Sequence, residues 1–79
     1  MLTYLTASWC QPCKKYLPVV QAEAAARGIE VTVLDIDTPH GATTAQLNQI
    51  QTVPAIILTD GTVVSGPRTK RQLSELLDV

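Results

Sequence analysis

The chain has 79 residues, of which 46% are hydrophobic and 16% charged, and its net charge is −1. This length and balance indicate a single globular domain over residues 1–79 and exclude a disordered chain. No nucleic-acid surface is expected. The densest basic patch, Arg68, Lys70 and Arg71, is interrupted by polar residues and is typical of the solvated start of a helix.

The apolar runs are too short to cross a membrane. The first ten residues also lack the charged region and the continuous apolar core of a signal peptide. We therefore expect a cytoplasmic protein that does not associate with membranes. In a reducing compartment, cysteines are more often catalytic or metal-bound than paired in structural disulfides.

The first half of the chain predicts a strand, a helix and a second strand. Leu2–Thr6 is short and rich in apolar and β-branched residues, and Ile29–Asp37 is rich in Val and Ile. Between them, Cys10–Arg27 carries an apolar stripe at helical spacing and ends before Gly28. Pro18 falls inside this helix and predicts a kink. The two strands should be parallel, with a right-handed crossover.

The segment after the second strand begins with a break. The sequence TPHG, residues 38–41, interrupts the pattern, so His40 is expected in an exposed loop. Residues 43–51 then predict a short helix with Leu47 and Ile50 facing inward.

The last third predicts a hairpin and a helix. Residues 55–59, AIILT, form the most apolar segment and indicate a central strand. Asp60–Gly61 is a hairpin signal, followed by an edge strand over residues 62–65. The apolar face of the last helix consists of Leu73, Leu76 and Leu77. The order βαβαββα predicts an α/β fold in which three helices flank both faces of a four-stranded mixed sheet.

The chemistry of the chain centres on its only two cysteines, Cys10 and Cys13. Cys10 should lie at a helix N-terminus, where unpaired N–H groups and the helix dipole favour a thiolate. Cys13 lies one turn along, within reach of a disulfide. This arrangement suits exchange, in which the first thiolate attacks a partner's disulfide and the second thiol resolves the mixed disulfide.

Two other interpretations of the cysteine pair are weaker. A structural zinc site normally needs four ligands, and the chain offers one distant histidine, His40, and at most Asp35 or Asp37 nearby in sequence. An inert structural disulfide would close too small a loop to constrain the unfolded chain. No metal site is therefore expected.

The segment TVPAI, residues 52–56, places Pro54 directly before a buried strand. The local sequence alone favours an ordinary trans proline at a strand start. A cis Val53–Pro54 bond is the alternative. It would leave the main chain of Val53 free to pair with an extended substrate, as in strand addition.

The segment WCQPCK resembles the thioredoxin active-site sequence W-C-G-P-C-K, with Gln11 in place of glycine. Pro18 stands where thioredoxins carry their helix-kinking proline. VPAIIL followed by DG resembles the thioredoxin and glutaredoxin segment that contains a cis-proline. The resemblance covers essentially the whole chain and implies a thioredoxin fold with a cis Val53–Pro54 bond.

The chain departs from this family pattern at two positions that govern proton transfer at the active site. Thioredoxins bury an aspartate six residues before the first cysteine, and here that position is Tyr4. The lysine that accompanies this acid on the next strand is replaced by Val33. The usual proton acceptor for the resolving thiol is therefore expected to be absent.

The segment VVSGPRTKRQL resembles the S-G-x-R region of the small glutaredoxin-sized redoxins that donate electrons to ribonucleotide reductase. Those redoxins accept electrons from thioredoxin reductase. The Gly-Gly-x-Asp segment with which glutaredoxins hold glutathione is absent, because Ser65, Gly66 and Pro67 occupy that region. The resemblance thus implies thioredoxin reductase as a partner, with a glutathione-dependent glutaredoxin as the alternative.

The implied function is reduction of protein disulfides by a monomer without a prosthetic group. Cys10 would be the exposed nucleophile and Cys13 the buried resolving thiol. The rim of the docking surface would consist of Trp9, Gln11, Pro12, Val53, Pro54 and Gly66. Two alternatives remain, a non-catalytic binding module that uses the same groove and a thiol oxidase or isomerase. The absence of a signal peptide disfavours the second.

Overall fold

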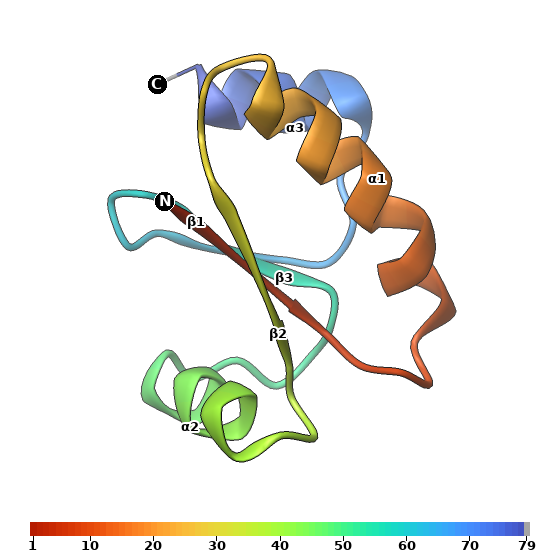
Figure 1. Cartoon of the computed structure of the whole chain (residues 1–79), viewed down its shortest axis with the longest axis vertical. Coiled ribbons are helices and arrows are strands. Elements are labelled where there is room, and N and C mark those ends of the chain that lie inside the picture. The colour runs from red at the N-terminus through yellow and green to blue at the C-terminus, as the bar shows by residue number, and fades with distance from the viewer. Residues whose placement is uncertain (79) are drawn as a thin grey trace.

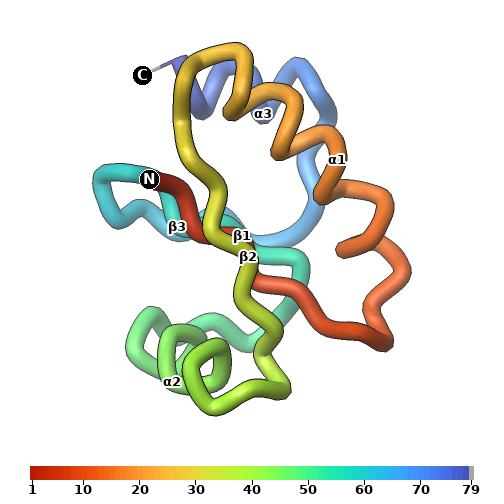
Figure 2. Tube along the Cα trace, viewed as in Figure 1, coloured from red at the N-terminus to blue at the C-terminus, as the bar shows by residue number. Residues whose placement is uncertain are grey.

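The computed structural model describes residues 1–78 and contains seven elements (Figures 1 and 2). In chain order they are β1 (Leu2–Thr6), α1 (Gln11–Ala25), β2 (Val31–Asp35), α2 (Pro39–Leu47), β3 (Ala55–Ile57), β4 (Val63–Ser65) and α3 (Lys70–Leu77).

The four strands form one sheet in the order β2-β1-β3-β4. β1 is parallel to β2 and antiparallel to β3, which is antiparallel to β4. The predicted fold class is confirmed, including the central place of β3 and the edge place of β4. The Asp60–Gly61 hairpin is also confirmed, with Gly61 at φ +91°.

Helices cover both faces of this sheet. α1 and α3 pack together on one face, and α2 lies on the other (Figure 1). Alternation along β1 explains the layers, because successive side chains of a strand point to opposite faces. Tyr4 belongs to the core beneath α1 and α3, whereas Leu5 belongs to the core beside α2.

The α1 helix begins one residue later and ends two residues earlier than predicted, and it continues through Pro18. Its buried residues are Cys13, Tyr16, Val20 and Ala24. α3 begins with a capping box, in which Thr69 accepts from the N–H of Gln72 and the Gln72 side chain accepts from the N–H of Thr69. The predicted exposed basic start of this helix is confirmed by Lys70 and Arg71.

The prediction for α2 was wrong by one helical turn. The helix begins at Pro39, because Thr38 caps it by accepting from the N–H of Gly41 and proline fits the first helical position. His40 is exposed as expected, but it lies in the first turn of α2 and not in a loop. Leu47 is 78% exposed and does not face inward, whereas Ile50 packs on the core.

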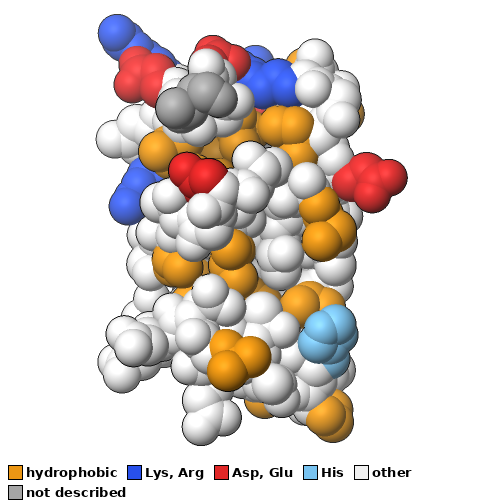
Figure 3. All heavy atoms as spheres, turned by 90° about the vertical axis from the view of Figure 1, so that its left-hand side faces the viewer, with side chains coloured by type: hydrophobic (Ala, Val, Ile, Leu, Met, Phe, Trp, Pro, Cys, Tyr) orange, Lys and Arg blue, Asp and Glu red, His pale blue; other side chains and the backbone are white. Residues whose placement is uncertain are grey.

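Charge is distributed unevenly over these layers. Residues 38–59, which include α2 and β3, contain no Asp, Glu, Lys or Arg. Figure 3 accordingly shows the blue and red side chains of this face in its upper half, while the lower part carries the pale blue His40 and no red or blue side chain. No helix among residues 1–78 is long and apolar enough to span a lipid bilayer.

Candidate active site

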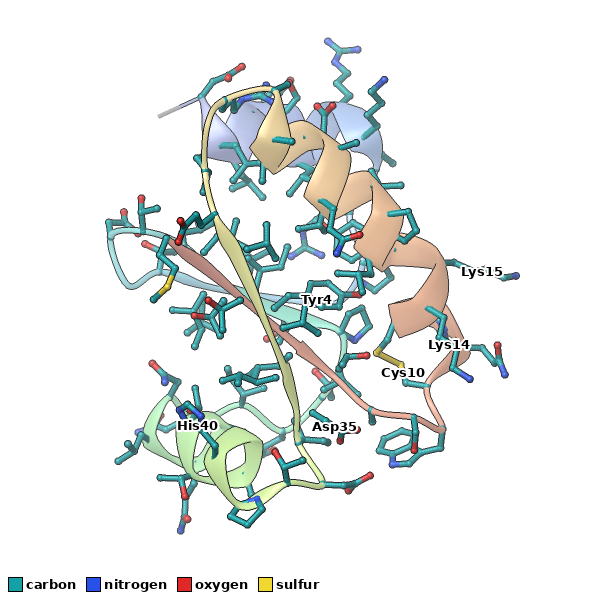
Figure 4. All side chains as sticks on the ribbon, in the orientation of Figure 1. Tyr4, Cys10, Lys14, Lys15, Asp35 and His40 are labelled. Atoms are coloured by element: carbon teal, nitrogen blue, oxygen red, sulfur yellow. A yellow bond between two sulfur atoms is a disulfide. The ribbon has the colours of Figure 1, made fainter. Side chains whose placement is uncertain are left out.

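Cys10 and Cys13 form a disulfide at the start of α1, with their Cα atoms 5.3 Å apart (Figure 4). Cys10 is the N-cap of the helix and has an extended backbone, and its Sγ accepts from the N–H of Cys13 at 3.3 Å. This N–H is one of the unpaired donors of the first helical turn. The same donor and the helix dipole would stabilise negative charge on Cys10 in the reduced form.

The two sulfurs differ in their access to solvent, but less than predicted. Cys13 is completely buried, and Cys10 retains only 5% exposure. The description of Cys10 as exposed is therefore wrong for the oxidised form. Ala7 is buried with the pair, and Ile36 and Val53 pack on this cluster. An incoming thiol or disulfide can reach only Cys10, because no atom of Cys13 contacts solvent.

The loop before β3 closes one side of the disulfide. The Val53–Pro54 peptide bond is cis, as the family resemblance implied. The carbonyl oxygen of Val53 lies 3.8 Å from the Sγ of Cys10. In the oxidised form this is a contact, because the sulfur carries no hydrogen. Within residues 1–78, the main chain of Val53 makes no main-chain hydrogen bond.

The predicted rim is assembled from three loops. Trp9, Gln11 and Pro12 are exposed around the disulfide, and Trp9 retains 65% exposure. Pro54 is buried instead, and its carbonyl accepts from the N–H of Gly66 at 2.8 Å. Gly66 therefore ties the loop after β4 to the cis-proline loop. Its positive φ of +81° is a conformation that suits glycine.

Asp37 is a rim residue that the sequence analysis did not assign to this role. The indole Nε1 of Trp9 donates to the Oδ2 of Asp37 at 3.1 Å. This bond joins the loop after β1 to the loop after β2. Asp35, in turn, accepts from the N–H of Asp37 at 2.8 Å, so its carboxylate is used in the turn. The sequence offered one signal for this bond. Trp9 follows β1 and Asp37 follows β2, and the ends of two neighbouring parallel strands lie at the same edge of a sheet.

Tyr4 has a specific contact with the site that the sequence analysis missed. Its hydroxyl is buried and donates to the main-chain carbonyl of Cys13 at 2.7 Å. Burial raises the pKa of Tyr4, so the phenol stays protonated at neutral pH. The residue fixes the first turn of α1 and offers no carboxylate. Val33 pairs in register with Tyr4 on β2 and is 41% exposed, so no lysine stands there either.

Two lysines follow the disulfide. Lys14 and Lys15 are exposed and project from α1 (Figure 4), and the first turn of this helix contains no acidic residue. His40 lies on α2, apart from the disulfide (Figure 4). The donor at the Cys10 sulfur is thus the main-chain N–H of Cys13, Trp9 supplies an exposed indole, and the two lysines add exposed positive charge on the adjoining part of α1.

One cysteine of the pair is completely buried and the other is barely accessible, and both lie at the start of a helix. The adjacent Val53 makes no main-chain hydrogen bond within residues 1–78. Together these features define a site for thiol–disulfide exchange. The sequence matches the family model for thioredoxin over residues 1–79. A thioredoxin of Mycolicibacterium smegmatis is 37% identical over 81 aligned positions, which cover 90% of this chain and 72% of the relative. The chain belongs to the thioredoxin family and is a dithiol thiol–disulfide oxidoreductase.

Other relatives agree with this assignment. A thioredoxin of Staphylococcus aureus strain Mu50 is 33% identical, with 91% of this chain and 73% of the relative covered. Among solved structures, the N21Q mutant thioredoxin from Halobacterium salinarum NRC-1 superposes with a TM-score of 0.83 at 27% identity, covering 98% of this chain and 70% of that chain. Thioredoxin 1 from Thermosipho africanus TCF52B, at 20% identity and a TM-score of 0.82, has the same fold, with 98% of this chain and 89% of that chain covered.

Proposed function

We propose that the chain works in the reducing direction, as a carrier of electrons from thioredoxin reductase to protein disulfides. The observation that supports this proposal is the position of Cys10 as the N-cap of α1, with its Sγ on the N–H of Cys13. A helix start stabilises the thiolate that must attack, and burial of Cys13 keeps the second thiol for the resolving step.

The cycle balances two electrons. The Cys10 thiolate attacks one sulfur of the partner's disulfide, an S–S bond forms between the proteins, and the partner's other sulfur leaves as a thiolate. Cys13 then loses its proton and attacks the Sγ of Cys10. The internal disulfide forms, and the partner's second sulfur leaves and takes up a proton. A reductase dithiol restores the pair by the reverse exchange.

The rim would hold the substrate during these steps. The free main chain of Val53 would pair with an extended segment next to the substrate's cysteine, in the manner of strand addition. Trp9 would supply apolar contact area at the entrance. Gly66 would support the Val53–Pro54 loop through its bond to Pro54.

The direct test is a pair of cysteine variants assayed on insulin disulfides. Cys13→Ser should accumulate a covalent mixed disulfide with the substrate, visible as a mass increase that dithiothreitol removes. Cys10→Ser should neither turn over nor form the adduct. If the wild type and Cys10→Ser both reduced insulin only at the rate of the uncatalysed reaction, the chain would be a binding module whose dithiol is silent.

A second experiment separates the two candidate reductants. The oxidised protein is mixed either with thioredoxin reductase and NADPH or with glutathione, and the thiols are counted over time. We expect reduction by the enzyme, and efficient reduction by glutathione alone would favour the glutaredoxin alternative. A redox titration of the Cys10–Cys13 pair would distinguish a reductant from an oxidase or isomerase.

Ribonucleotide reductase is the proposed acceptor, by resemblance of residues 63–73 to the small redoxins. We also propose that the domain acts as a cytoplasmic monomer without a prosthetic group, since the cysteines carry the electrons themselves. Ribonucleotide reduction with this protein as the only electron donor, and sedimentation of the purified chain, would test these points.

A further inference from the structure

An open groove of about 380 Å³ lies beside the disulfide and shares only Gln11 and Pro12 with the predicted rim. It is lined by Gln11, Pro12, Lys15, Tyr16, Val19 and Pro67. Gln11 and Pro12 lie between the two cysteines, and Pro67 follows Gly66 of the rim. The groove is therefore continuous with the entrance to Cys10 and runs from it along α1.

The walls of the groove suit an apolar side chain with a polar neighbour. Pro12, Val19 and Pro67 provide apolar surface. Tyr16, which also lines the groove, is 5% exposed. Its ring contributes to the wall, whereas its hydroxyl is buried beneath the surface and faces the main chain of Arg68.

Unpaired positive charge lies in and next to the same groove. Lys15 lines it, and Arg68 directly follows Pro67, with its Nη1 lying 3.5 Å from the Pro67 carbonyl. Lys70 lines a neighbouring hollow that shares Val19, together with Glu23, which pairs with Arg27. Within residues 1–78, these three cations form no ion pair.

The two basic residues that form ion pairs lie elsewhere, one just past the end of α1 and one on α3. Arg27 pairs with Glu23 and Asp78, and Arg71 pairs with Glu75. Neither arginine lines the groove. The free cations near Cys10 are therefore concentrated where a partner's chain would pass.

We propose that this groove is a subsite for an extended, acidic segment of the disulfide-containing partner. An apolar side chain of that segment occupies the groove between Pro12, Val19 and Pro67. A neighbouring Asp or Glu pairs with Lys15 or Arg68. This inference rests on the proposed function and adds the substrate class that the site prefers.

The test uses the reduced 79-residue chain and two synthetic disulfide peptides. Both carry the same leucine near the cysteine, flanked by glutamates in one peptide and by lysines in the other. The second-order rate of oxidation is followed by stopped-flow through the fluorescence of Trp9. We expect the acidic peptide to react about fivefold faster at low salt, a magnitude typical of one or two exposed ion pairs. The difference should shrink as salt screens the charges.

Charge-reversal variants show whether the preference for the acidic peptide arises in the groove. Lys15→Glu should lower the rate of the acidic peptide roughly fivefold and raise that of the basic one. Arg71→Glu makes the same change in net charge outside the groove and should leave the ratio near that of the wild type. Equal effects of the two variants would overturn the subsite, because net charge alone would then explain the preference.

A small neutral disulfide separates the subsite from the proposed function. Hydroxyethyl disulfide is too short to occupy the groove, so each peptide rate is divided by the rate of the same variant with this compound, which removes any effect of Lys15→Glu on the reactivity of Cys10 itself. If the wild type fails to reduce this compound and the peptides, the proposed function is wrong. If it reduces all of them without preference, only the subsite is wrong.

Discussion

The two faces of the sheet are built differently, and the active site lies where they meet. Beneath α1 and α3 the core contains large buried side chains, including Tyr4, Val20 and Leu73. Beside α2 the buried residues are Leu5, Ala45 and Ala55. The first face holds Cys13 rigidly, and the second contributes the loops with Ile36 and Val53 that contact the cysteines.

The faces differ in charge as well. All six basic residues lie on or next to α1 and α3, whereas residues 38–59 carry no charged side chain. Positive charge that could recognise a partner is therefore confined to one side of the disulfide. The other side offers main chain and apolar surface, together with the carboxylate of Asp37 that Trp9 binds.

Removing a large side chain from the first face should have the largest effect on stability. Leu73 is completely buried, and Leu73→Ala should lower the free energy of unfolding by about 2–5 kcal/mol because it leaves a cavity. The matched control is Leu47→Ala on α2, where the side chain is 78% exposed, with an expected change within about 0.5 kcal/mol. Urea unfolding measures both. Equal losses would mean that the two faces contribute alike.

On the α2 face, stability should depend on the close approach of two main-chain segments more than on the volume of buried side chains. A Cβ added to Gly41 would overlap the main-chain carbonyl of Asp35, so the helix must move away from β2. Gly41→Ala should cost about 1–3 kcal/mol, as overpacking does. Thr43→Ala, at an exposed position of the same helix, should be neutral or slightly stabilising in the same urea experiment. If Gly41→Ala were equally neutral, α2 would not be held against β2 by this contact.

Gly41 also shows where prediction from sequence failed. The segment TPHG was interpreted as a break, although Thr38 and Pro39 are the cap and first residue of a helix. The same four residues can form either a break or the start of a helix. The close contact of Gly41 with the main chain of Asp35 accompanies the helix in the folded protein, and it cannot be recognised in the local sequence. The strands, by contrast, were predictable because their apolar runs are bounded by turn residues, as Leu2–Thr6 shows.

The site was predictable in its residues but not in its contacts. The spacing of Cys10 and Cys13 at a helix start follows from local sequence alone. The bond from Tyr4 to the Cys13 carbonyl joins residues nine positions apart on different elements, and the bond from Trp9 to Asp37 spans 28 positions. Such pairs depend on how the elements pack, which no local pattern encodes.

The two buried tyrosines offer a finer comparison within the first face. Their ring centroids are 6.0 Å apart, but only the Tyr4 hydroxyl has a partner within residues 1–78. Tyr4→Phe should cost about 0.5–1.5 kcal/mol, the net worth of one hydrogen bond. Tyr16→Phe should leave the free energy of unfolding unchanged or raise it slightly, since it removes a buried hydroxyl that meets no hydrogen-bond geometry within residues 1–78. Thermal and urea unfolding of both variants test this. Identical losses would show that ring packing, and not the bond to Cys13, sets the stability.

The smallest expected effect concerns the far end of the same face, where Arg27 joins α1 to α3. Its Nε donates to the Oδ1 of Asp78 at 2.6 Å, and its Nη2 donates to Ser74. The hydrogen bond to Arg27 lowers the pKa of Asp78 below its usual range. The folded state thus binds a proton less readily than the unfolded chain, and the stabilisation is present above the ordinary pKa of an aspartate.

This stabilisation is lost as the pH falls through the lowered pKa of Asp78. Asp78→Asn should therefore reduce the urea midpoint slightly at pH 7, and wild type and variant should converge once the pH lies below the lowered pKa of Asp78, where the carboxyl is protonated in both states. Glu75→Gln is the control, since its partner Arg71 is almost fully exposed and the pair is held at 3.5 Å. A pH-independent difference between wild type and Asp78→Asn would mean that the side chain stabilises this end by packing and not by its charge.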